Sequence, residues 1–412
     1  MEHCAAVPSR LPDGVPAPAD GALPFAARRE LGRNPFGFYV HVPFCTTRCG
    51  YCDFTTYTAQ ELGPGVSQAA YADTAMLEIR LARHVLGDRV PPVETVFFGG
   101  GTPTLLPAGH LGSILGEIDE LFGLAAGAEV TTEANPESVT PAYLERLREA
   151  GFTRISFGMQ SAAPHVLRLL DRQHTPGRAV EVVGEARRAG FSHVNLDLIY
   201  GTPGESEADW QASLETAIAA GPDHVSAYAL VVEEGTALAR KVRRGELPEP
   251  DDDLLADRYV QADETLSRNG YGWYEVSNWA RGTAARSRHN HLYWTGGDWW
   301  GVGPGAHSHV GGVRWWNVRH PAPYAAKLHA GESPAAGREL LDPAARRMEA
   351  TMLGLRLREG LPVRELSARA REAAGDAVGY GLLDRRAHDD GRAVLTLRGR
   401  LLADAVARDL TD

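Results

Sequence analysis

The chain has 412 residues, of which 43% are hydrophobic and 23% charged, and this is enough for a large core and two domains. Its formal net charge of −11 argues against a broad nucleic-acid interface. The sequence contains no apolar run long enough to predict a transmembrane helix, and it lacks the basic start and apolar run that would predict a signal peptide. Its few, clustered cysteines favour the cytoplasm.

Residues 1–35 are expected to form a flexible extension. Prolines interrupt every helical or strand period in this segment, at Pro8, Pro12, Pro16, Pro18 and Pro24. The isolated Cys4 in the same segment is expected to be an exposed thiol without a role.

Between residues 36 and 250 short apolar runs alternate with amphipathic stretches. The apolar runs, which we predict to be strands, cover 38–42, 95–98, 129–132, 154–157, 194–200 and 224–230. Helical patterns cover 68–86, 109–122, 140–150, 162–171, 176–189 and 207–220, with Thr140 as an N-cap and Pro141 at the first helical position. Strand-then-helix units in this order predict an α/β fold with a parallel sheet and helices outside it.

The remaining chain divides into two regions. Residues 251–335 include a segment, 271–316, that is dense in aromatic side chains and histidines. Residues 336–412 are predicted to be a small C-terminal domain, mostly of small helices after residue 343, with a short strand at 394–397 and a last helix after Gly399.

Three of the four cysteines, Cys45, Cys49 and Cys52, fall within eight residues. Three thiolates on one loop can each bind one iron of a cubane cluster and leave the fourth iron open. A zinc site would need a fourth nearby Cys or His, and a disulfide framework would need an even number of cysteines.

Polar and glycine-rich segments follow several predicted strands. They are the cysteine loop, the Gly-Gly-Gly-Thr-Pro sequence at 99–103, and the segments 133–136, 158–161 and 201–204. Because the carboxyl ends of parallel strands meet at one rim, we expect a shared ligand site there. Glycines allow backbone amides to approach a ligand closely. Glu133 can receive a cationic amine or a ribose hydroxyl, and Asp197 is either a second ligand or a strand-end carboxylate satisfied by backbone amides.

The cysteine spacing on the first strand loop, followed by Gly-Gly-Gly-Thr-Pro, resembles the radical S-adenosylmethionine (SAM) superfamily. Segments 39–45, 133–136, 154–161 and 195–201 are similar to the oxygen-independent coproporphyrinogen III oxidase-like group within it. The resemblance implies a partial (β/α)6 TIM-like barrel over residues 36–250, completed by residues 251–335 and followed by a small, mostly α C-terminal domain. It also implies a 4Fe-4S cluster bound by the three cysteines and S-adenosyl-L-methionine on the open iron. The side chains and turns implied to hold S-adenosylmethionine are Tyr39, Tyr51, Gly100, Gly101, Thr102, Glu133, Gln160, Arg172 and Asp197.

Two features distinguish this chain from the oxidase and bear on its function. The oxidase carries a further cysteine where this chain has Phe54, and this chain has a His-Asn-x-x-Tyr-Trp motif at 289–294. Both features resemble the HemW-type heme chaperones of the same group. That resemblance implies heme contacts through His289, Asn290, Tyr293 and Trp294, with His291, His307 and His309 as alternative axial ligands and Arg286 and Arg288 as propionate partners. Without it, the aromatic segment is more typical of a packing cluster.

Two hypotheses follow. The first is a heme chaperone that transfers heme to acceptor proteins, with respiratory heme proteins, a low-potential electron donor and a homodimer as implied partners. The second is an active radical enzyme, either the oxidase or a methylase or other porphyrin-modifying enzyme. The motif and Phe54 favour the chaperone, whereas the complete cofactor pocket keeps the enzyme open, and no catalytic residue is assigned.

Overall fold

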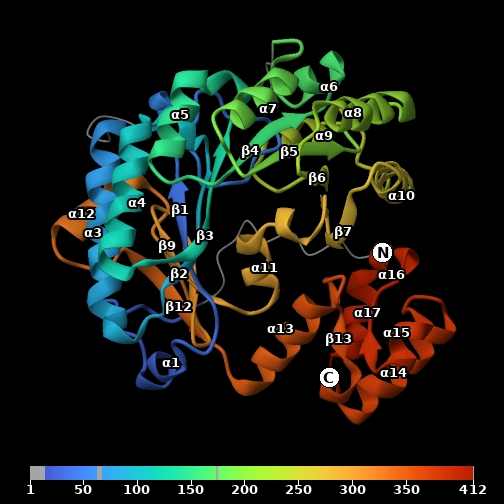
Figure 1. The fold of residues 1–412 in the computed structure, drawn as a ribbon. Coiled ribbons are helices and arrows are strands. Elements are labelled where there is room, and N and C mark those ends of the chain that lie inside the picture. Colours follow the sequence, from blue (N-terminus) through green and yellow to red (C-terminus); the bar gives the residue numbers. More distant parts are fainter. Residues whose placement is uncertain (1–13, 63–66, 173–174, 412) are drawn as a thin grey trace.

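The computed structural model describes residues 14–62, 67–172 and 175–411, and within these ranges its centre is a 12-stranded sheet (Figure 1). The strand order is β12-β11-β10-β9-β1-β2-β3-β4-β5-β6-β8-β7. Neighbouring strands from β9 to β6 are all parallel, and the strands at both ends are antiparallel. The parallel strands are β1 (Phe36–Val42), β2 (Val93–Gly100), β3 (Leu124–Ala134), β4 (Arg154–Gln160), β5 (His193–Tyr200), β6 (His224–Ala229) and β9 (Asp298–Val302).

Helices cover the outer face of this curved sheet (Figure 1). They are α3 (Gln68–Leu86), α4 (Ala108–Phe122), α5 (Pro141–Glu149), α6 (Pro164–Leu169), α7 (Arg178–Arg188) and α8 (Glu207–Ala220). Because the strands are covered on both faces, β4 is buried along its whole length. The predicted α/β fold is confirmed, and the Thr140 side chain accepts a hydrogen bond from the Tyr143 amide as an N-cap should.

The aromatic region adds strands to both ends of the parallel sheet and a helix between them. After α9 (Ala237–Arg243) and α10 (Asp252–Arg268), strands β7 (Gly272–Glu275) and β8 (Asn278–Ala280) extend the β6 edge. The chain then passes through α11 (Arg288–Trp294), and β9 returns to pair with β1. Strands β10 (His307–Val310), β11 (Val313–Asn317) and β12 (Ala335–Leu340), with α12 (Pro321–His329), complete that side. Shorter elements are α2 (Ala59–Leu62), η1 (Gly87–Arg89), η2 (Pro103–Leu105), η3 (Pro136–Ser138), η4 (Thr283–Ala285) and η5 (Val363–Glu365).

Part of the expected flexible extension is packed onto the sheet. Val15 forms an antiparallel bridge with Arg338, and α1 (Phe25–Glu30) buries Ala27 beside the buried Leu23. Cys4, Pro8 and Pro12 lie outside the described residues.

The C-terminal region has its own apolar core, separate from that of the barrel. It contains α13 (Pro343–Leu355), β13 (Leu361–Pro362), α14 (Ala368–Gly379), α15 (Arg385–Asp389), β14 (Arg392–Ala393), α16 (Leu397–Leu401) and α17 (Ala403–Leu410). The predicted strand at 394–397 is wrong, because strand β14 ends at Ala393, Leu395 makes only an isolated bridge with Leu383, and Thr396 caps α16. Since β12 pairs with β11, we propose that the domain boundary follows residue 340 rather than residue 335. In the described chain no helix is long and apolar enough to cross a membrane.

Candidate cofactor and ligand site

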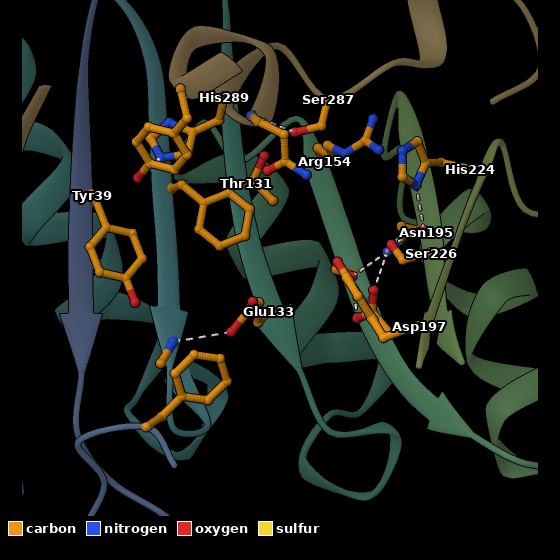
Figure 2. Close-up of a pocket in the computed structure, with 17 residues that line it drawn as sticks. Tyr39, Thr131, Glu133, Arg154, Asn195, Asp197, His224, Ser226, Ser287 and His289 are labelled. Carbon is orange, nitrogen blue, oxygen red and sulfur yellow. Dashed lines mark hydrogen bonds between the residues drawn. The ribbon is translucent and has the colours of Figure 1, made fainter. Parts of the chain in front are cut away.

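A cavity of about 220 Å³ lies inside the barrel, between strands β1 to β6 and helix α11 (Figure 2). Glu133 and Asp197 lie toward the carboxyl ends of their strands, whereas Arg154 and His224 start theirs. Helix α11 closes the amino-terminal end of the cavity. We call this cavity the lumen; its lining residues are Tyr39, Phe54, Phe97, Gly100, Thr131, Glu133, Arg154, Ser156, Asn195, Asp197, His224, Ser226, Tyr228, Ser287, His289, Asn290 and Tyr293.

Two buried carboxyl groups, Glu133 and Asp197, dominate the electrostatics of the lumen. Burial and then the nearby Asp197 charge raise the pKa of Glu133 to about 8, against a hydrogen bond from the Gly100 amide at 3.1 Å. Burial also raises the pKa of Asp197. Two buried carboxyl groups in one cavity favour a cationic ligand, because a positive charge would restore their ionised form.

The Asp197 carboxylate is the end of a directed chain of hydrogen bonds. Asn195 Nδ2 donates to Asp197 Oδ1 at 2.7 Å, and His224 Nδ1 donates to Asn195 Oδ1 at 2.6 Å. The Tyr274 hydroxyl bonds His224 Nε2 at 2.7 Å and accepts from the Ser287 amide at 3.1 Å. The chain therefore runs from the N-cap of α11 along the lumen wall to Asp197. The structure contradicts the alternative in which backbone amides satisfy Asp197, because the Ser156 and Asn195 side chains donate to its carboxylate.

The three cysteines of the loop after β1 are free and half-buried. Burial raises the pKa of Cys45, and burial raises that of Cys52 to about 11, with the neighbouring thiols adding to both shifts. The buried Thr56 hydroxyl lies beside Cys45 and Cys52 and lowers the pKa of both thiols, against the effect of burial. A cationic iron cluster would supply the positive charge that these thiols need to ionise.

The cysteine geometry suits a cluster better than a single ion. In the described part of the chain no three His, Cys, Asp or Glu side chains converge to hold one metal ion. A cubane binds each thiolate at a different iron, so its ligands stand apart. The residues present therefore fit a 4Fe-4S cluster.

Arg172 connects the cluster loop to β4. Its Nη1 donates to Cys49 Sγ at 3.7 Å, and its Nη2 lies 3.5 Å from the Gly158 carbonyl oxygen. Gln160 ends β4 with a φ of 66°, a conformation that is costly for a residue with a side chain and common at functional sites. A Cβ on Gly158 would lie 2.5 Å from Arg172 Nη2 and 2.7 Å from Gln160 Nε2, so glycine allows these groups to meet. Tyr51 packs beside this group on a small apolar cluster.

The glycine turn after β2 is bound to the end of β1. The Gly101 amide donates to the Val42 carbonyl oxygen at 2.8 Å, and the Thr102 amide donates to the Phe44 carbonyl oxygen at 2.7 Å. These amides are engaged within the protein, so a ligand would meet the Cα atoms or carbonyl oxygens of the turn instead.

The motif on α11 points into the protein. His289 is 1% exposed, with Nδ1 at 2.8 Å from Thr95 Oγ1 and Nε2 at 2.7 Å from the Tyr293 hydroxyl. Asn290 and Trp294 lie beside the buried Glu275 and lower its pKa against the effect of burial. In this position His289 has no free ring nitrogen, so the closed helix does not fit heme ligation by His289. Of the alternative ligands, His291 and His309 are half-buried and His307 is exposed.

The other expected heme contacts are also engaged. Arg286 Nη1 bonds Glu359 Oε1 at 2.6 Å, and Arg288 Nη2 bonds Glu94 Oε2 at 3.1 Å. Most tryptophans of the aromatic segment are core residues: Trp273, Trp279, Trp300, Trp315 and Trp316. The reading of this segment as a packing cluster is therefore the one that the structure supports for these side chains.

Sequence reasoning missed Thr95, Ser156, Asn195, His224, Ser226, Tyr274 and Glu275. A signal was present: polar residues recur at every second position of β4, β5 and β6, at Arg154 and Ser156, Asn195 and Asp197, and His224 and Ser226. In a parallel barrel this period places them all on the inner face.

Comparison with known proteins agrees with this geometry. Residues 39–217 match the family model of the Radical SAM superfamily. The solved structure of coproporphyrinogen III oxidase (HemN) from Escherichia coli, a radical SAM enzyme, superposes with a TM-score of 0.79 at 22% identity, covering 95% of this chain and 94% of that one. The fold and the cysteine loop therefore define a radical SAM protein.

Relatives in sequence are more specific. The chain is 56% identical to the heme chaperone HemW of Mycobacterium tuberculosis, over 92% of this chain and 95% of that protein. It is 35% identical to HemW of Synechocystis over 79% of each chain, and 39% identical to the mitochondrial radical S-adenosyl methionine domain-containing protein 1 of Bos taurus over 67% of this chain and 61% of that protein. The chain belongs to the HemW family.

Proposed function

We propose that this chain is a heme chaperone, which binds heme and transfers it to heme-accepting proteins. The observation that carries this proposal is the 56% identity, over nearly the whole of both chains, to a protein named heme chaperone HemW. Phe54 supports it, because this 59% exposed side chain lines the lumen where the oxidase-like pattern calls for a further cysteine.

The cofactors of this proposal are a 4Fe-4S cluster and S-adenosylmethionine. Cys45, Cys49 and Cys52 would hold the cluster, with Arg172 and Thr56 beside it. When bound, the cluster would supply an electron and an open iron for the amine and carboxylate of S-adenosylmethionine. Glu133 and Asp197 would face the positive charge of that ligand. Tyr39, Tyr51, the glycine turn and Gln160 would complete the pocket.

Chaperone and oxidase are separated by offering two substrates to the same protein. The cluster is reconstituted without oxygen. One sample then receives heme, and a second sample receives coproporphyrinogen III together with S-adenosylmethionine and reductant. We expect stoichiometric heme uptake, followed by absorbance, and no protoporphyrinogen. Formation of protoporphyrinogen would instead show that this chain is an active radical enzyme that uses the carboxylate pocket.

The cluster assignment has its own test. Cys45→Ala, Cys49→Ala and Cys52→Ala should each remove the brown chromophore of the anaerobically reconstituted protein, because each takes one iron ligand away. Cys4→Ala, which lies outside the motif, should keep it. A full chromophore in any of the first three variants would contradict the ligand set.

A further inference from the structure

Helix α11 is the floor of the lumen and is bound to the barrel at its N-terminal end. The amide of Ser287, its N-cap, donates to the Tyr274 hydroxyl at 3.1 Å. The His289 amide donates to Glu129 Oε1 at 3.0 Å, and both groups are buried. A short helix of this kind is stable only through such tertiary contacts, because isolated helices of one or two turns do not persist in water.

The side chains of α11 reach two opposite walls. His289 bonds Thr95 of β2 and stacks on Phe97 with ring centroids 5.1 Å apart. On the other side, the Asn290 and Trp294 side chains lie beside the buried Glu275 of β7 and lower its pKa against the effect of burial. All four motif residues therefore face groups of the protein itself.

This arrangement leaves heme no place at the motif. Both ring nitrogens of His289 are bonded and its side chain is 1% exposed, so neither nitrogen is free to bind a heme iron in this position. A porphyrin cannot reach His289 unless α11 moves away from the barrel.

We propose that α11 is a releasable floor: heme binds the motif only when α11 leaves the lumen, and a ligand in the lumen holds α11 closed. This inference rests on the proposed heme-chaperone function. Since Asp197 is joined to the N-cap of α11 by a chain of hydrogen bonds, a ligand bound at Asp197 would stabilise the closed position through that chain. By linkage, S-adenosylmethionine weakens heme binding, and heme weakens S-adenosylmethionine binding by the same factor.

The hydrogen-bond chain provides the connection between the two ligands. It begins at the Ser287 amide, passes through Tyr274, His224 and Asn195, and ends at Asp197. Every donor in this chain of hydrogen bonds points toward the Asp197 carboxylate. A cation bound at Asp197 therefore acts on the N-terminal end of α11 through these bonds. Removing the Tyr274 hydroxyl breaks this connection, while Asp197 keeps its own hydrogen bonds from Ser156 and Asn195.

The experiment measures heme affinity of the full chain, with its cluster reconstituted, by absorbance titration with and without S-adenosylmethionine. We expect S-adenosylmethionine to raise the heme Kd about fivefold or more, within the usual range of such couplings. Tyr274→Phe should bind heme more tightly than the wild type and lose most of this dependence. Tyr380→Phe, at a 70% exposed position of the C-terminal region, is the matched control and should behave as the wild type.

A second measurement needs neither a variant nor S-adenosylmethionine. Hydrogen exchange of the amides of residues 288–294 should become faster when heme is added to the wild type, since the floor then opens. If Tyr274→Phe fails to fold, Glu275→Gln serves in its place, because it weakens the hold on Asn290 and Trp294.

The outcomes separate this inference from the chaperone proposal. A heme affinity that S-adenosylmethionine leaves unchanged, or unchanged exchange at 288–294 with heme bound, would overturn the releasable floor. Heme binding that His307→Ala abolishes and His289→Ala preserves would also overturn it, since His307 is exposed on β10, and would leave the chaperone standing. Absence of heme uptake by the wild type would overturn the proposed function itself.

Discussion

His41 shows how one buried side chain positions the cluster loop. Its Nε2 donates to the Thr55 carbonyl oxygen at 2.8 Å, just after Cys52, and its Nδ1 lies 2.9 Å from the Tyr39 hydroxyl. One ring nitrogen donates and the other accepts, so these bonds need the neutral ring. Burial lowers the pKa of His41 to about 4, against the hydrogen bond to Thr55.

Because of this pKa shift, the free energy of unfolding of the protein depends on pH. The folded pKa of about 4 lies below the unfolded value of 6.5, so the unfolded chain takes up the proton first. The stability that neutral His41 contributes is present above pH 6.5 and is lost as the pH falls toward 4, by up to about 3 kcal/mol. His41→Gln keeps a donor for Thr55 and cannot titrate. Urea unfolding at pH 7 and pH 5 should show a smaller acid-induced loss in this variant than in the wild type; equal losses would contradict the assignment.

At the scale of elements, the glycine turn between β2 and η2 is built around the same histidine. Gly100 has a φ of +105°, and a Cβ there would lie 2.4 Å from the His41 ring. A Cβ on Gly101 would lie 2.4 Å from the Phe44 carbonyl oxygen. The turn can therefore approach the cluster loop only with glycine at both positions.

Substituting alanine tests this packing against a matched glycine. Gly100→Ala should lower the free energy of unfolding by about 1–3 kcal/mol, because it adds both a clash and backbone strain. Gly116→Ala, in the middle of α4 where a Cβ meets nothing within 4 Å, should raise it by about 0.5–1 kcal/mol. Denaturant midpoints measure both variants, and a Gly100→Ala protein as stable as the wild type would refute the close approach.

The motif on α11 did not predict the direction in which its side chains point. The resemblance of the His-Asn-x-x-Tyr-Trp motif to the HemW-type proteins implied heme contacts, and in the structure His289 and Tyr293 lie four residues apart on one face of α11. Which way that face points depends on Thr95, which is 194 residues from its partner His289 in the chain, and on Glu275. A sequence motif contains no information of this kind, so the expected heme contacts at the motif did not include the hydrogen bonds that engage His289 in this structure.

At the scale of the whole molecule, Arg400 joins the C-terminal region to the barrel. Its guanidinium bonds both Asp263 oxygens, at 3.0 and 2.8 Å, and lies 4.3 Å from the Trp273 ring centroid. Figure 1 shows the C-terminal helices standing beside α11 and β7, apart from the outer layer of helices. Such polar contacts accompany the packing of Leu397 on the barrel core, so this joint is sensitive to single polar changes.

Arg400→Lys should loosen the joint by about 1–2 kcal/mol, because lysine lacks the fork that bonds both oxygens and the flat face that packs on tryptophan. Faster hydrogen exchange of residues 397–410, with the barrel unchanged, is the expected result. Arg268→Lys is the control, since its pair with Glu264 spans 4.0 Å on an exposed surface. Identical exchange in both variants would show that Arg400 does not hold the joint.

The sequence by itself determined the local features of this protein. Apolar period and capping residues placed the six parallel strands and their helices, and short spacing brought Cys45, Cys49 and Cys52 to one loop. Glu133 and Asp197 were found because strand ends meet at one rim. Only the tertiary structure decided that α11 closes the lumen, that Asn195 and His224 join it to Asp197, and that β9 returns to β1. These contacts pair groups that lie far apart in the chain, and no local propensity encodes which distant groups will satisfy one another when both are buried.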